Sequence, residues 1–129
     1  MRVAAILFFM GLLGLGATIT PGVGLFGGFI VMLPQWVTEL SHIPAYGILT
    51  WLLTLSLQRH GMFRTNALLA GGLGATLFGM GMEFCQAFVP GRVVDAGDVM
   101  LNSVGVVAAA IVMCRQPVSD RPAERRSAA

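Results

Sequence analysis

Four long stretches dominated by apolar residues restrict this chain to a membrane-spanning fold. They cover residues 3–19, 44–58, 66–84 and 95–114. A helix needs about 20 mainly apolar residues to cross the hydrocarbon core of a bilayer. Charged residues make up only 11% of the chain, whereas about one-quarter of a soluble domain is charged. The sequence therefore predicts an all-α fold: a polytopic membrane protein built as a bundle of four transmembrane helices.

The segment after the first predicted helix is apolar but short. Residues 22–34 read GVGLFGGFIVMLP, and Pro21 precedes them. A run of this length is typical of a re-entrant or interfacial segment. The alternative is that it extends the first helix beyond a kink at Pro21. The first stretch itself, residues 3–19, is short for a span. A cleaved signal peptide is the alternative there, and we expect a retained helix.

Charge is distributed unequally between the two predicted membrane faces. Four spans place both termini and the 59–64 loop on one side, with a net charge of +5, against −3 on the other side. Arg-rich short loops stay in the cytoplasm. We therefore predict cytoplasmic termini. Residues 1–114 form the predicted membrane domain, and residues 115–129 form a predicted disordered, Arg-rich cytoplasmic tail.

The most polar part of the membrane domain is the outward-facing stretch from Glu83 to Gly105. It contributes six candidate ligand-binding residues: Glu83, Gln86, Arg92, Asp95, Asp98 and Asn102. Asp95, Asp98 and Asn102 follow an i, i+3, i+7 spacing, which places them on one helical face. Ionisable side chains near a bilayer are costly, so they indicate a functional site. The spacing predicts an acidic cluster around the Arg92 guanidinium.

The same residues also have a purely structural interpretation. Asp95 could cap the last helix, with Asp98 as the third residue of a weak capping box. Arg92 could form a salt bridge with Glu83, and Asn102 could form an interhelical hydrogen bond. The sequence leaves these alternatives open.

Two further candidate site residues, His42 and Tyr46, lie at the start of the second predicted helix. They are four residues apart and so share one helical face. His42 is the one histidine on the outward side, and no cysteine stands at ligand spacing from it. The spacing therefore predicts no metal site and no other cofactor. The sequence also lacks a phosphate-binding loop and a nucleic-acid-binding motif, so we expect membrane lipids rather than nucleic acid as partners.

Small residues form a stripe on the third predicted helix. Gly71, Ala75 and Gly79 recur every four residues and would let another helix approach closely, which makes a homo-oligomer through this stripe a further prediction. Cys85 and Cys114 are predicted at opposite ends of their helices, about 30 Å apart, and therefore unpaired.

Together these residues resemble a known family. The run Glu83-x-x-Gln86-x-Phe88-Val89-Pro90-Gly91-Arg92-x-x-Asp95-x-x-Asp98-Val99-x-x-Asn102-x-x-Gly105 resembles the C-terminal signature of VanZ-like membrane proteins. His42-x-x-x-Tyr46 resembles their second-helix motif, and the likeness spans residues 38–110. The family often carries an Asp-Lys pair ahead of the histidine, where this chain has Thr38 and Glu39. The resemblance implies a small protein of the bacterial inner membrane, in a family associated with low-level teicoplanin resistance.

Three functions fit these observations. The first is binding or modulation of a cell-envelope molecule, a lipid-linked headgroup or a glycopeptide, with Arg92 contacting a phosphate or carboxylate. The second is an enzyme that uses a carboxylate and His42 for acid–base chemistry on a lipid-linked substrate. The third is a structural subunit of a membrane complex that assembles through its glycine stripes. Binding is the leading hypothesis.

Overall fold

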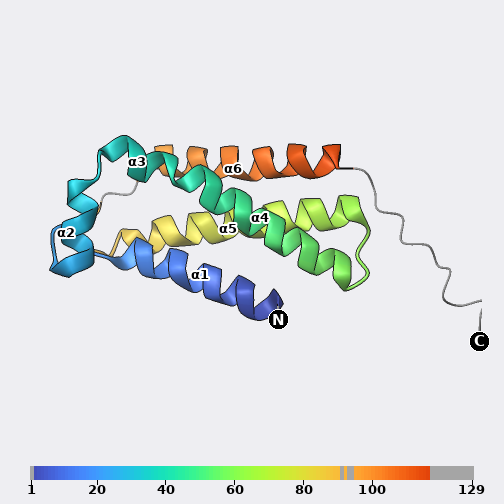
Figure 1. Cartoon of the computed structure of the whole chain (residues 1–129), viewed down its shortest axis with the longest axis horizontal. Coiled ribbons are helices and arrows are strands. Elements are labelled where there is room, and N and C mark those ends of the chain that lie inside the picture. Colours follow the sequence, from blue (N-terminus) through green and yellow to red (C-terminus); the bar gives the residue numbers. More distant parts are fainter. Residues whose placement is uncertain (1, 91, 93–94, 117–129) are drawn as a thin grey trace, which may run out of the picture.

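The computed structural model describes residues 2–90, 92 and 95–116, and this part of the chain folds into helices joined by turns. The helices are α1 (Arg2–Thr18), α2 (Gly24–Met32), α3 (Gln35–Leu40), α4 (His42–Arg59), α5 (Arg64–Gln86) and α6 (Ala96–Arg115) (Figure 1). The described residues contain no strand. The predicted all-α class is therefore confirmed.

Helices α1, α4, α5 and α6 run lengthwise and form the bundle (Figure 1). Helix α4 is central, because it packs against α1, α5 and α6. Within the described residues, three segments are long and apolar enough to cross a membrane: Gln35–Arg59, Arg64–Gln86 and Ala96–Arg115. Helix α1 is apolar but has only 17 residues. The fold is that of a multi-pass membrane protein, and a fourth crossing by α1 remains a prediction.

The segment after α1 forms a separate helix, α2, that lies across one end of the bundle (Figure 1). Gly22 and Gly24 have positive φ angles of 79° and 68°, which turn the chain between α1 and α2. The alternative that this segment extends α1 is therefore wrong. With 9 residues, α2 is about 14 Å long and cannot cross a bilayer core of about 30 Å. Its apolar side chains are exposed, Leu25 to 92% and Met32 to 83%, as in a helix that a membrane surface would cover.

The start of the second predicted helix needs correction. Helix α4 begins at His42 instead of Pro44, and the short helix α3 leads directly into it. Ser41 joins the two with α-helical backbone angles of −62° and −22°. Pro44 still falls in the first turn of α4, where its missing N–H is tolerated. His42 is therefore held by a rigid helix, not by a loop.

The small-residue stripe of α5 packs against α4 inside the chain. A Cβ on Gly79 would lie 2.9 Å from the Tyr46 ring, and one on Gly71 would meet Thr54. Ala75 of α5 and Leu49 of α4 are both 0% exposed and belong to the centre of the core. These contacts occupy the stripe, so the same residues are not free to bind a second copy. Self-association of the chain remains a prediction.

Helices α4 and α6 cross at a pair of glycines. A Cβ on Gly105 would collide with the carbonyl oxygen of Ile43, and one on Gly47 would lie 3.3 Å from the carbonyl oxygen of Gly105. Only glycine allows two helix backbones to approach this closely. Gly105 thus permits the close packing of α6 on α4. Because His42 precedes Ile43, this crossing brings it beside the first turns of α6.

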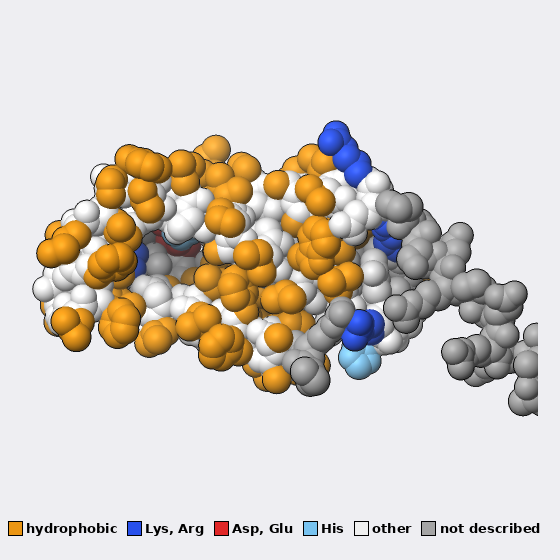
Figure 2. Space-filling view, in the orientation of Figure 1, with side chains coloured by type: hydrophobic (Ala, Val, Ile, Leu, Met, Phe, Trp, Pro, Cys, Tyr) orange, Lys and Arg blue, Asp and Glu red, His pale blue; other side chains and the backbone are white. Residues whose placement is uncertain are grey.

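The end of the bundle that holds the α4–α5 loop carries basic side chains (Figure 2). Arg64 donates hydrogen bonds to the carbonyl oxygens of Met113 and Gln116, the latter at 2.9 Å, and so satisfies the carboxyl end of α6. Cys85 and Cys114 are free, as predicted. Helix α6 ends at Arg115, and the boundary between membrane domain and tail at residue 114 remains a prediction. Most of the tail predicted to be disordered, residues 117–129 of 115–129, lies outside the described residues.

Candidate functional site

A pocket of about 430 Å³ lies between α1, α4 and α5, at the end of the bundle that holds α2 and α3. Apolar residues of α1, among them Leu12, Leu13 and Ala17, line one side of it. Its polar lining residues include His42, Tyr46, Glu83, Gln86 and Arg92. Figure 2 shows a hollow in this part of the surface, with acidic side chains at its floor, hydrophobic side chains around it and a basic side chain at its edge. The pocket is therefore amphipathic.

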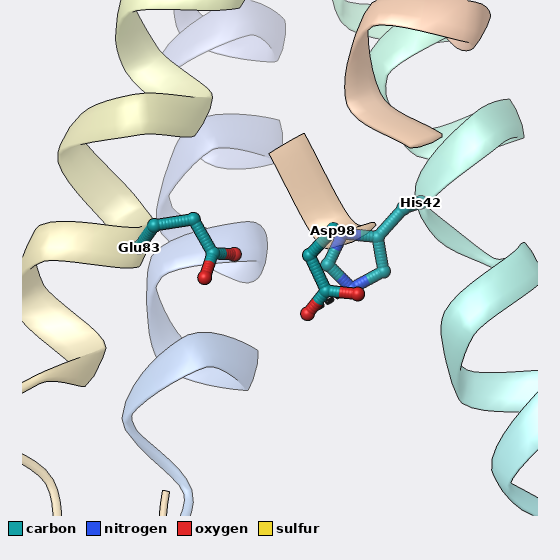
Figure 3. Close-up of side chains that lie close together, drawn as sticks. All are labelled: His42, Glu83 and Asp98. Atoms are coloured by element: carbon teal, nitrogen blue, oxygen red, sulfur yellow. Dashed lines mark ion pairs between the residues drawn. The ribbon is translucent and has the colours of Figure 1, made fainter. Parts of the chain in front are cut away.

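Three ionisable side chains converge at the polar side of this pocket. His42 comes from α4, Glu83 from α5 and Asp98 from α6, and their nearest nitrogen and oxygen atoms all lie within 4.8 Å of one another (Figure 3). The His42 Nε2 atom lies 3.8 Å from Asp98 Oδ2. We call these residues the His–Glu–Asp cluster. The structure thus brings together two of the acids predicted to cluster, and it adds the histidine that the sequence presented as a separate candidate.

Asn102 fixes the orientation of His42. Its side-chain oxygen lies 2.9 Å from His42 Nδ1, and Asn102 is 3% exposed. With this oxygen as the acceptor, the tautomer that fits is the one that carries its proton on Nδ1 and donates it to Asn102. In the neutral ring the lone pair is then on Nε2, the nitrogen that faces Asp98. The predicted interhelical hydrogen bond of Asn102 is confirmed, and its partner is the histidine of α4.

Tyr46 and Gln86 lie at the edge of the cluster and are both buried. The Tyr46 ring stacks on His42 with a centroid distance of 6.3 Å and an interplanar angle of 17°, so the predicted shared face of the two residues is confirmed. Gln86, in the last turn of α5, is 5% exposed and lines the pocket. Both side chains can present polar atoms to a bound molecule.

Arg92 ties the chain after α5 to the first helix. Its Nη2 atom donates a hydrogen bond to the carbonyl oxygen of Gly16 at 3.1 Å. The alternative salt bridge between Arg92 and Glu83 is not formed, because the one ion pair among the described residues joins His42 and Asp98. Arg92 also lines the pocket, so its guanidinium stands at the pocket rim and holds α1 in place.

Asp95 lies outside the His–Glu–Asp cluster. Its Oδ1 atom accepts a hydrogen bond of 2.7 Å from the backbone N–H of Gly97, as an N-cap residue does, and the residue is exposed. The capping alternative is therefore confirmed for Asp95. Asp98, the other proposed capping residue, instead directs its carboxylate toward His42.

Two parts of this site could not be predicted from the sequence. The first is the contribution of α1, which reads as an ordinary apolar helix. The second is the convergence of potential metal ligands. Histidine and cysteine spacing along the chain predicts no metal site, whereas these ligands come from three separate helices. The concentration of six polar residues between Glu83 and Asn102, within an apolar sequence, was the signal that pointed to the site.

Comparison with known proteins agrees with this architecture. The profile of the VanZ/LLP1 family matches residues 17–116 of the chain. Searches of curated proteins and of solved structures return no match. The matched region runs from the last turn of α1 to the end of α6. It contains the His–Glu–Asp cluster, Asn102 and the polar residues that line the pocket. The chain belongs to the VanZ/LLP1 family and is a VanZ-like membrane protein.

Proposed function

We propose that this protein binds an amphipathic molecule of the cell envelope in the pocket between α1, α4 and α5. The polar headgroup of that molecule would lie at the His–Glu–Asp cluster, and its apolar part would lie along α1. The observation that supports this proposal is the pairing of an apolar helix wall with buried polar side chains in one pocket of about 430 Å³. Pockets of this size, mainly apolar with a few convergent polar groups, are typical of small-ligand sites.

Arg92 is the residue best suited to hold an anionic part of such a headgroup. A guanidinium has five N–H donors, and one hydrogen bond, to Gly16, is formed with the described residues. Its planar fork matches a phosphate or carboxylate, which accepts two parallel hydrogen bonds. Gln86 and Tyr46 can add neutral hydrogen bonds from the buried side.

Two observations support a molecule of the cell envelope as the ligand: the charge distribution of the chain and its family. The Arg-rich end of the bundle lies opposite the pocket, and the positive-inside rule would place that end in the cytoplasm. The pocket would then open toward the outer side of a bacterial inner membrane. A lipid-linked headgroup or a glycopeptide would reach it there, consistent with the low-level teicoplanin resistance associated with the family.

One observation favours acid–base catalysis as a second candidate function. Asn102 holds His42 so that Nε2 faces the carboxylates, an arrangement in which a base is oriented by a third group. The bound molecule would then be a substrate. Incubation with the protein would convert it to a new product, which binding alone does not do.

The Arg92→Lys variant tests the binding role. Lysine keeps the charge but loses the bidentate geometry, so we expect roughly tenfold weaker binding of an anionic ligand, the effect of one lost charge-assisted hydrogen bond. Native mass spectrometry of the purified protein can measure binding of short-chain phosphatidic acid and of teicoplanin, and chromatography of the probe afterwards detects any product. Arg59→Lys, at the opposite end of the bundle, is the matched control. If Arg92→Lys binds the anionic ligand as tightly as Arg59→Lys does, Arg92 is not the residue that contacts the anion.

A further inference from the structure

The His–Glu–Asp cluster offers one nitrogen and two carboxylates from three different helices. Such a set does not arise from local sequence, since residues 42, 83 and 98 meet only when α4, α5 and α6 are packed. Each side chain presents a ligand atom within 4.8 Å of the other two (Figure 3). In a tetrahedral zinc site, ligand atoms at normal bond lengths lie about 3.3 Å apart. Rotation of the two carboxylates would be enough to bring the three atoms to that spacing.

Glu83 is the strongest indication that the cluster binds something. The residue is 4% exposed, and its Oε2 atom has no hydrogen-bond partner among the described residues. A buried carboxylate oxygen without a partner is costly, and native proteins rarely retain one without a function. Arg92 forms no salt bridge with Glu83, and the hydrogen bond of its guanidinium goes to the Gly16 carbonyl. Two carboxylates therefore face one histidine, and within the described part of the chain no Lys or Arg side chain pairs with either of them.

The surroundings of His42 match those of a metal-binding histidine. A ligating imidazole usually donates its second ring N–H to an oxygen acceptor, which fixes the tautomer and the direction of the ligating nitrogen. Asn102 Oδ1 accepts from Nδ1 here at 2.9 Å, and Nε2 lies 3.8 Å from Asp98 Oδ2. Both partners are held by helices, so this orientation is preorganised.

We propose that His42, Glu83 and Asp98 bind one divalent metal ion of the Zn²⁺, Co²⁺ or Mn²⁺ class. Mixed imidazole and carboxylate ligands favour these ions, and the cluster contains no thiolate that would favour Cu(I). Three protein ligands leave a coordination position open, as in catalytic metal sites. Two of the three ligands, His42 and Glu83, line the pocket, so a water molecule or an anionic headgroup oxygen could reach the ion from there. This site goes beyond the proposed function and does not depend on it.

Titration of the purified, full-length protein with Co²⁺ tests the metal site directly. The protein should carry no histidine tag, and a chelator should first remove bound metal. We expect visible absorption bands that saturate at one Co²⁺ per chain and disappear when Zn²⁺ is added. Glu83→Gln and Asp98→Asn should each weaken Co²⁺ binding by about tenfold or more. Thermal unfolding of each variant shows whether it folds. Asp95→Asn and Glu39→Gln, which change acids outside the cluster, should bind like the unaltered protein.

The proposal is overturned if Co²⁺ does not bind at one ion per chain, or if folded Glu83→Gln and Asp98→Asn proteins bind as tightly as the control variants. A positioning role for Asn102 makes an additional prediction. Asn102→Leu should weaken Co²⁺ binding by about 10- to 100-fold, and Asn102→Asp, which keeps the acceptor oxygen, should restore most of it. These measurements contain no lipid ligand. A protein that does not bind Co²⁺ would therefore contradict the metal site without contradicting the proposed binding of an amphipathic molecule, which the Arg92→Lys variant tests.

Discussion

Replacing Gly105 with alanine is expected to destabilise the protein by about 3 kcal/mol, because the added Cβ has no room in the α4–α6 crossing. That atom would collide with the carbonyl oxygen of Ile43 and lie 3.1 Å from the backbone nitrogen of Gly47. Both are backbone atoms of α4, so no side chain can rotate away to relieve the contact. The two helices must separate, and His42 then moves away from Asp98 and Asn102.

Gly81→Ala provides the matched control for this variant. Gly81 is also in the interior of a long helix, and an added Cβ there would meet nothing within 4 Å. Alanine favours helix over glycine, so Gly81→Ala should be neutral or stabilising by up to about 1 kcal/mol. Thermal unfolding in detergent, followed by a thiol-reactive or tryptophan probe, compares the two. If Gly105→Ala unfolds at the same temperature as Gly81→Ala, α4 and α6 do not cross as described.

Replacing Glu83 with glutamine is expected to weaken metal binding by about tenfold or more while stabilising the metal-free protein. Glutamine has nearly the same shape, so the packing of α5 is preserved. The change removes a negative charge from a side chain that is 4% exposed and has an oxygen without a partner in the described structure. Leaving such a group buried costs about 1–3 kcal/mol, so we expect the free energy of unfolding to increase by about 1–2 kcal/mol. Functional residues often lower stability in this way.

The control for Glu83→Gln is Glu39→Gln, on the same side of the bundle. Glu39 Oε1 accepts a hydrogen bond of 2.7 Å from Gln35 at the surface, so this variant should change stability by less than about 0.5 kcal/mol. Chemical unfolding in detergent with a chelator present measures the free energy of unfolding of both variants. Titration with Co²⁺ in the absence of the chelator measures their metal binding. A lower stability of Glu83→Gln, in proportion to lost binding, would contradict a functional role and favour a structural one.

The polar part of the site could be predicted from the sequence because polar residues stand out in apolar helices. The spacing of Asp98 and Asn102 placed them on one face of α6, and that of His42 and Tyr46 placed them on one face of α4. The structure confirms both faces, which meet through the His42–Asn102 hydrogen bond. Gly105 lies three residues beyond Asn102 in the same helix, and the structure shows that it allows the backbone of α4 to approach.

The partners of these residues could not be predicted. In a membrane protein both the lipid-facing and the core-facing sides of a helix are apolar, so hydrophobic periodicity does not show which side packs. The sequence therefore did not reveal that α1 forms a wall of the pocket or that Arg92 bonds to the Gly16 carbonyl. It also did not reveal that the Gly71–Gly79 stripe packs inside the chain, against α4.

Thiol accessibility tests most directly whether the polar residues face a water-filled pocket inside a membrane-embedded bundle. Ala45→Cys would place a thiol in the pocket, and Ile48→Cys would place one on the apolar surface groove between α4 and α6, three residues further along α4. Ile48 is the more exposed of the two in the isolated molecule, at 49%, but lipid would cover it. Both variants are made with Cys85→Ser and Cys114→Ser, and membrane fragments are treated with a charged maleimide. If the polar residues face a water-filled pocket, the maleimide should label Ala45→Cys rapidly and Ile48→Cys not at all. Labelling of Ile48→Cys without labelling of Ala45→Cys would contradict this arrangement.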